Sequence, residues 1–161
     1  MKYRKEDLDK ELNTRLGKDA EAIAAKEEKA EQDRYDLQEF VVDFGFLESI
    51  EVLKDWFNSK HVPYKMPFKL KEGIHVNEHR YLIRLEDTES IWFKKKYINF
   101  YVTKTVDESV RDPRHPSGYW VGIEHNFGKY GNHKSGIRVD KATRVLKDVL
   151  MDIVEKGTSE F

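Results

Sequence analysis

The sequence predicts an α+β domain with N-terminal helices, an antiparallel sheet of about four strands, and a C-terminal helix packed on the sheet. Three observations predict this class. Residues 3–57 hold helix-forming residues and no proline, short β-branched and aromatic runs follow between residues 68 and 123, and residues 140–157 have one apolar face. Because the strand-like runs leave no room for crossover helices, the sheet is expected to be antiparallel.

Residues 1–34 are predicted to form a charged helical extension. Ala, Glu and Lys dominate this stretch, Gly17 predicts a break in the helix, and Asp19 is a suitable N-cap for the part that follows. The few apolar side chains after Asp19 can bury little surface on any face. We therefore expect a solvated helix, with a helical arm or weak coiled coil on a partner as the alternative.

Residues 35–157 are predicted to form a single α+β domain, followed by a tail at 158–161. An apolar 3/4 spacing from Leu37 to Phe57 predicts a packed helix, or two helices if Gly45 bends it. The final helix is expected to begin at Asp140 and to end at Gly157. The strands are expected at 68–71, 80–85, 97–103 and 119–123.

Composition excludes several classes of protein. The 161 residues carry a formal net charge of −1, which argues against a wholly basic nucleic-acid binder and a wholly acidic DNA mimic. The chain has no cysteine, so disulfides, thiolate metal sites and cysteine nucleophiles are excluded. No apolar run approaches the length of a membrane span, and the first residues do not resemble a signal peptide. We expect a soluble, cytoplasmic protein.

The charge is segregated along the chain. Residues 35–59 have a net charge of −5, while residues 60–110 and 111–138 each have a net charge of +3. The acidic block places carboxylates at 3/4 spacing, which suits either an ordinary solvated helix face or a row of charges that imitates phosphates toward a basic groove. The acidic partner-binding candidates are Asp36, Glu39, Asp43, Glu48, Glu51 and Asp55.

A glycine-rich segment at residues 125–136 contains no acidic residue and is expected to be a long loop. Long loops in compact domains are commonly functional, and aromatic and basic side chains on them anchor protein interfaces. The candidates for orienting a protein partner here are His125, Phe127, Lys129, Tyr130 and His133.

Basic and aromatic residues also alternate around the third strand, which suits nucleic-acid binding because lysines contact phosphates and exposed rings stack on bases. The simpler interpretation is that the lysines form a hairpin turn and that Ile98, Phe100 and Val102 face the core. The candidates for this alternative function are Lys94, Lys95, Lys96, Tyr97, Arg111, Arg114, Lys134 and Arg138.

Catalytic patterns are weak. His75, Glu78 and His79 match H-x-x-E-H, but this zinc signature requires a helix, and the flanking sequence predicts a turn. No Ser/His/Asp triad and no glycine-rich phosphate loop can be assigned. We therefore expect no enzymatic activity, no metal and no cofactor.

The acidic stripe, the Ala/Glu/Lys helix, the absence of cysteine and the lack of a catalytic signature make the chain resemble the small inhibitors encoded by phages and mobile elements, including the anti-CRISPR proteins. The resemblance implies a bacterial host cytoplasm and inhibition by stoichiometric contact. The expected function is therefore a non-catalytic inhibitor that binds a nucleic-acid-handling enzyme, such as a CRISPR effector nuclease or its nucleoprotein complex. The alternative is a nucleic-acid-binding accessory protein.

Overall fold

The computed structural model describes residues 2–17, 19–64, 66–89, 95–104, 118–127 and 132–156. Within these ranges the chain forms four α-helices and one five-stranded antiparallel sheet, in the order helices, strands, helix, which confirms the predicted α+β class. None of the helices in the described ranges is both long and apolar enough to cross a membrane.

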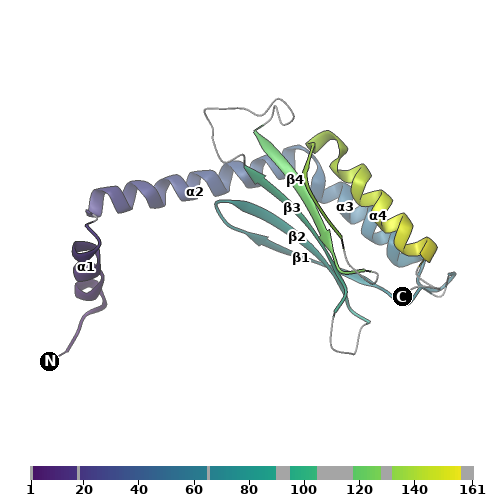
Figure 1. Ribbon diagram of the computed structural model, residues 1–161, viewed down its shortest axis with the longest axis horizontal. Coiled ribbons are helices and arrows are strands. Elements are labelled where there is room, and N and C mark those ends of the chain that lie inside the picture. Colours follow the sequence, from purple (N-terminus) through teal and green to yellow (C-terminus); the bar gives the residue numbers. More distant parts are fainter. Residues whose placement is uncertain are drawn as a thin grey trace.

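The N-terminal helices are α1 (Lys5–Arg15) and α2 (Ala20–Asp43). They are separated as predicted, because Gly17 adopts a φ of 68° and the Asp19 carboxylate accepts a hydrogen bond of 2.6 Å from the Ala22 amide. Helix α2 runs through the expected boundary at residue 34, and its first buried residue is Leu37. Figure 1 shows α1 and the first turns of α2 extending away from the body as an arm.

Two further helices lie against the sheet. Gly45, with a φ of 82°, lets the chain turn from α2 into α3 (Phe46–Ser59). The last helix, α4 (Ala142–Lys156), follows a 3₁₀ turn at Val139–Lys141, so the α-helix begins two residues after the predicted start at Asp140. Helices α3 and α4 pack side by side (Figure 1).

The sheet is a meander in which every strand pairs with its neighbour in sequence. The strands are β1 (Leu70–Val76), β2 (Arg80–Asp87), β3 (Tyr97–Lys104), β4 (Tyr119–His125) and β5 (Asn132–Ile137). The fifth strand was not predicted, because its sequence, NHKSGI, shows neither apolar alternation nor β-branched enrichment. It adds to the edge of β4 through an irregular register between Val121 and Ile123.

The core lies between one face of the sheet and the helices. Ile83 of β2 and Phe100 of β3 are direct partners across the ladder, and both are fully buried, as are Phe46 of α3 and Leu146 of α4. The Phe46 and Phe100 rings meet edge to face with their centroids 5.3 Å apart. Because side chains alternate along a strand, the residues between these core positions point to the opposite face of the sheet.

Candidate functional site

The opposite face of the sheet carries a convergent set of basic, aromatic and polar side chains. We call it the open face, since the described helices α2, α3 and α4 contact the other side of the sheet. The residues on this face are identified from the alternation of side chains along each strand and from the register between the strands. They are Arg80, Arg84 and Glu86 of β2, Tyr97, Asn99 and Tyr101 of β3, Trp120 and Glu124 of β4, and His133 of β5.

Two arginines on this face lie over tyrosine rings. The guanidinium carbon of Arg80 is 4.1 Å from the centroid of the Tyr101 ring, and that of Arg84 is 4.3 Å from the centroid of the Tyr97 ring. Both pairs join β2 to β3. Stacking of this kind fixes the guanidinium and leaves its in-plane N–H groups free to donate hydrogen bonds.

The polar residues around Tyr101 form a second set of contacts. The Tyr101 hydroxyl lies 2.6 Å from Nε2 of His133, and the Asn99 amide donates a 3.1 Å hydrogen bond to Glu124. Burial raises the pKa of the Tyr101 hydroxyl above 10.0, the positive charge of Arg80 opposes this rise, and Glu124 adds to it. Tyr101 is only 4% exposed, so its ring supports Arg80 and offers no surface for stacking on a base.

The hairpin between β1 and β2 sets the position of Arg80. The Asn77 side chain accepts 2.8 Å hydrogen bonds from the amides of both His79 and Arg80, which closes the turn. His75 lies in β1, whereas Glu78 and His79 lie in the turn. The predicted turn is present at Glu78 and His79, but β1 extends beyond its expected end at residue 71 and includes His75. The H-x-x-E-H pattern therefore spans a strand and a turn and lacks the helix that a zinc signature needs.

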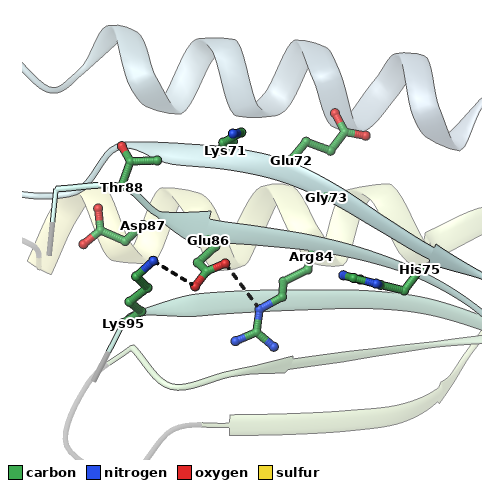
Figure 2. Close-up of a pocket in the computed structure, with 9 residues that line it drawn as sticks. All are labelled: Lys71, Glu72, Gly73, His75, Arg84, Glu86, Asp87, Thr88 and Lys95. Carbon is green, nitrogen blue, oxygen red and sulfur yellow. Dashed lines mark ion pairs between the residues drawn. The ribbon is translucent and has the colours of Figure 1, made fainter. Parts of the chain in front are cut away.

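A pocket of about 380 Å³ opens at the end of the open face next to β1 (Figure 2). Lys71 and His75 of β1, Arg84 of β2 and Lys95 contribute basic side chains to its lining. Glu86 lies between two of them, 3.9 Å from Nε of Arg84 and 3.7 Å from Nζ of Lys95. The terminal nitrogens of Arg84 point away from Glu86 (Figure 2).

Of the residues predicted for nucleic-acid binding, only some lie on the open face. Lys95 lines the pocket and Tyr97 lies beneath Arg84, so both belong to the open face. Two other described candidates make local contacts, since Lys96 donates to the carbonyl of Asn126 at 3.0 Å and Arg138 pairs with Asp140 at 3.3 Å. Lys134 is exposed on β5, opposite Ile123 of β4. Lys94, Arg111 and Arg114 lie outside the described residues.

The acidic candidates lie on the outer surfaces of α2 and α3, which we call the acidic helix surface. Asp36 is half-buried and accepts a hydrogen bond of 2.8 Å from Gln32, while Glu39, Asp43, Glu48, Glu51 and Asp55 are exposed. Among these six, one ion pair is described, from Lys54 to Asp55 at 3.9 Å. The carboxylates therefore face solvent on the helix layer, and the stacked arginines lie on the opposite side of the sheet.

The candidates from the expected loop separate into different environments. Phe127 is 3% exposed and packs edge to face on Phe68 with centroids 4.9 Å apart, so its assignment as a contact residue is wrong. His125 is half-buried, its Nδ1 accepts from the Phe127 amide at 3.3 Å, and burial lowers its pKa. His133 is exposed on β5 and contacts Tyr101. Lys129 and Tyr130 lie outside the described residues.

Sequence reasoning missed Lys71, Arg80 and Arg84. The signal was present in β2, where Arg80 and Arg84 occupy the positions that alternate with the buried Tyr81, Ile83 and Leu85. A basic residue at an alternating position indicates an exposed sheet face, but the stacking on tyrosines depends on the register between β2 and β3, which the sequence does not show.

Comparison with known proteins found no matching family model, no significant match to a curated protein and no significant match to a solved structure. Within the described residues, no group of three or more His, Asp or Glu side chains is arranged to hold a metal ion. Function is therefore inferred from the open face and the acidic helix surface alone.

Proposed function

We propose that the protein is a nucleic-acid-binding accessory protein, and that its open face contacts the phosphates of a single strand. The observation that supports this proposal best is the pair of arginines stacked on tyrosines, Arg80 on Tyr101 and Arg84 on Tyr97. Each guanidinium lies over a ring, and the terminal nitrogens of Arg84 point away from Glu86, which suits the bidentate recognition of phosphate oxygens.

The separation of the two arginines favours a ligand with several phosphates over a single small anion. Arg80 and Arg84 are four residues apart on one strand, which separates them by about 13 Å at the usual rise of a strand. Lys71 and Lys95 extend the basic surface toward the pocket. Three carboxylates, Glu72, Glu86 and Asp87, also line the pocket and offset this charge. The contacts of Glu86 to Lys95 and Arg84, at 3.7 and 3.9 Å, are long and partly exposed, so each contributes little.

A single strand suits this surface better than a duplex. Trp120 is half-buried on the open face and meets the Tyr101 ring at a steep angle, with centroids 6.2 Å apart. A partly exposed indole provides a surface on which an unpaired base can stack, a contact that contributes about 1 to 3 kcal/mol per base in proteins of this kind.

The test is fluorescence anisotropy with labelled single-stranded DNA, single-stranded RNA and duplex DNA across a salt series. We expect single strands to bind more tightly than the duplex, with affinity falling as salt rises. Replacing both Arg80 and Arg84 by Gln should weaken binding at least tenfold and reduce the slope of log K against log salt by roughly 1.4, about 0.7 for each lost phosphate contact.

The matched control is Arg34→Gln, which removes an exposed arginine from α2, on the helix side of the molecule. It should leave both affinity and salt slope unchanged. The proposal is wrong if no strand binds at low salt, or if the control variant loses as much affinity as the double variant.

A second function is favoured by the exposure of the acidic helix surface, where one described ion pair, from Lys54 to Asp55, offsets the six carboxylates. Such a surface suits docking on the basic nucleic-acid channel of an enzyme, so we propose as the alternative a non-catalytic inhibitor of a nuclease such as a CRISPR effector. Charge should then set association rate and selectivity.

The inhibitor hypothesis is tested by adding the protein to purified effector nucleases in a cleavage assay. Reversing Asp36, Glu39 and Asp43 to Lys should abolish inhibition. Reversing the three exposed acids of α1, which are Glu6, Asp7 and Asp9, changes the net charge equally and should leave inhibition intact. Equal loss in both triple variants would show a net-charge effect and contradict a specific docking surface.

A further inference from the structure

The pocket beside β1 contains an ordered series of hydrogen-bonding groups. The two carboxylate oxygens of Glu86 have different neighbours, because Oε2 lies 3.9 Å from Nε of Arg84 and Oε1 lies 3.7 Å from Nζ of Lys95. Both distances are too long for a hydrogen bond, so these groups do not satisfy one another. In the order Arg84, Glu86 and Lys95 (Figure 2), the pocket therefore presents a donor, two acceptors and a donor.

The other two carboxylates in the lining are engaged outside this series. Glu72 lies 3.9 Å from Nζ of Lys54 on α3, and its carboxylate points away from Glu86 (Figure 2). Asp87 is 2% exposed, and its Oδ1 accepts hydrogen bonds from two backbone amides, at 3.1 and 3.0 Å. The Glu86 side chain is 38% exposed, which makes it the most accessible of the three carboxylates to a ligand.

Gly73 leaves space for a ligand beside this series. It is the direct partner of Arg84 across the β1–β2 ladder, and side-chain alternation places it on the open face between Lys71 and His75. Outside its chain neighbours, the nearest atom to a Cβ built on Gly73 is a backbone oxygen at 4.0 Å, so the strand is not covered there. The pocket volume of about 380 Å³ lies in the range of small-molecule sites and accommodates one nucleobase.

Guanine is the base whose edge complements the series. Its O6, N1–H, N2–H and N3 groups follow one another as an acceptor, two donors and an acceptor. The two donors match the two oxygens of Glu86, and the flanking acceptors match Arg84 and Lys95. Adenine and cytosine offer one amino donor beside a ring-nitrogen acceptor, which would face the second carboxylate oxygen. Uracil offers a single donor, which leaves one carboxylate oxygen without a partner.

We propose that this pocket binds a guanine base of the strand that contacts the open face, with Glu86 accepting from N1–H and N2–H of the base. The inference rests on the proposed nucleic-acid binding and adds base selectivity to it. Nε of Arg84 faces Glu86 and the terminal nitrogens point away from it (Figure 2), which suits contact with the base on one side and a phosphate on the other. Proteins commonly read single strands through the edges of unpaired bases.

The test is fluorescence anisotropy with short labelled uridine strands that differ only in one central base, which is guanine, hypoxanthine, adenine or uracil. We expect the guanine strand to bind about tenfold more tightly than the adenine and uracil strands, within the range for one bidentate base contact. Hypoxanthine lacks the N2 amino group and should give an intermediate affinity. Equal affinity for all four strands overturns the guanine pocket and leaves the proposed strand binding intact, whereas no binding of any strand overturns both.

Glu86→Gln tests the role of the carboxylate directly. The variant keeps the shape of the side chain but replaces one acceptor oxygen by a donor amide, so the preference for guanine should disappear. Its affinity for the all-uridine strand should rise, because a negative charge is removed from a basic surface. A variant that merely disturbed the sheet would lose affinity for all strands.

The matched control is Glu78→Gln, which removes the same charge from the β1–β2 turn, outside the pocket lining. The Glu78 side chain is 42% exposed, close to the 38% of Glu86. This variant should keep the preference for guanine. A preference that survives Glu86→Gln, or one that is lost equally in Glu78→Gln, contradicts the proposal.

Discussion

The ring of Tyr101 lies over Gly122, its direct partner across the β3–β4 ladder. A Cβ atom placed on Gly122 would overlap the Tyr101 ring, so the close approach depends on the missing side chain. From this position the Tyr101 hydroxyl reaches His133 on β5, and the ring supports Arg80 of β2. A single glycine thus allows one tyrosine to connect four strands of the open face.

The first prediction concerns this glycine. Gly122→Ala should destabilise the protein by about 1 to 3 kcal/mol, because the added methyl group forces the Tyr101 ring out of its place. It should also weaken nucleic-acid binding, since Arg80 loses its support. Urea unfolding and the anisotropy assay measure the two effects.

Gly73→Ala is the matched control for this prediction. Gly73 also lies in a strand, and the atom nearest to a Cβ built there is the carbonyl oxygen of Arg84 at 4.0 Å, so an alanine fits without overlap. If both variants lose the same stability, the loss comes from replacing any glycine within a strand of this sheet. In that case the overlap with Tyr101 is not the cause.

The second prediction concerns Asn58, which joins the end of α3 to the start of β1. Its side chain donates to the carbonyl of Leu70 at 2.9 Å and accepts from the amide of Leu70 at 2.8 Å. Asn58→Ala leaves both backbone groups without these bonds and should cost about 1 to 3 kcal/mol in urea unfolding. Ser59→Ala removes a local, exposed contact to Trp56 and should change stability by less than about 0.5 kcal/mol. A comparable loss in Ser59→Ala would show that any substitution at the end of α3 is destabilising, and would contradict a specific role of the hydrogen bonds to Leu70.

Much of the fold could be predicted because local signals agreed with the tertiary structure. Gly17 and Gly45 both adopt positive φ at helix breaks, and the alternation in β2 and β3 correctly assigned Ile98, Phe100 and Val102 to the core. These features depend on residue type and spacing within one element, which the sequence displays directly.

The residues of the site were harder to predict from the sequence, because their positions depend on the register between strands and on the pairing of β5 with the edge of β4. Strand β5 is held by pairing with β4, and its own sequence has low strand propensity. Phe127 follows β4 in a segment that reads as a loop, yet it turns into the core against Phe68. The placement of Arg84 over Tyr97 requires knowing that β2 and β3 pair with Arg84 opposite Asn99.

The third prediction compares two glycines that both adopt a positive φ. Gly45→Ala should destabilise the body by about 1 kcal/mol, because an alanine at a φ of 82° is strained, and Gly45→Asn should cost less. Gly17→Ala introduces similar strain at a φ of 68°, but α1 has no buried residue, so its effect should not appear in the urea transition of the body. Equal shifts in both variants would mean that α1 unfolds together with the body.

The fourth prediction concerns pH. Burial lowers the pKa of His125 below its usual 6.5, the hydrogen bond with the Phe127 amide opposes part of this fall, and the positive charge of Lys134 adds to it. Below pH 6.5 the unfolded chain therefore takes up this proton before the folded chain does, so the free energy of unfolding should fall as pH drops from about 7 through 6.5 toward the lower pKa of the folded state. His125→Gln should flatten this part of the urea-midpoint profile. His79→Gln, which removes an 84% exposed histidine, should retain the full slope, and a flattened profile in both variants would contradict the assignment to His125.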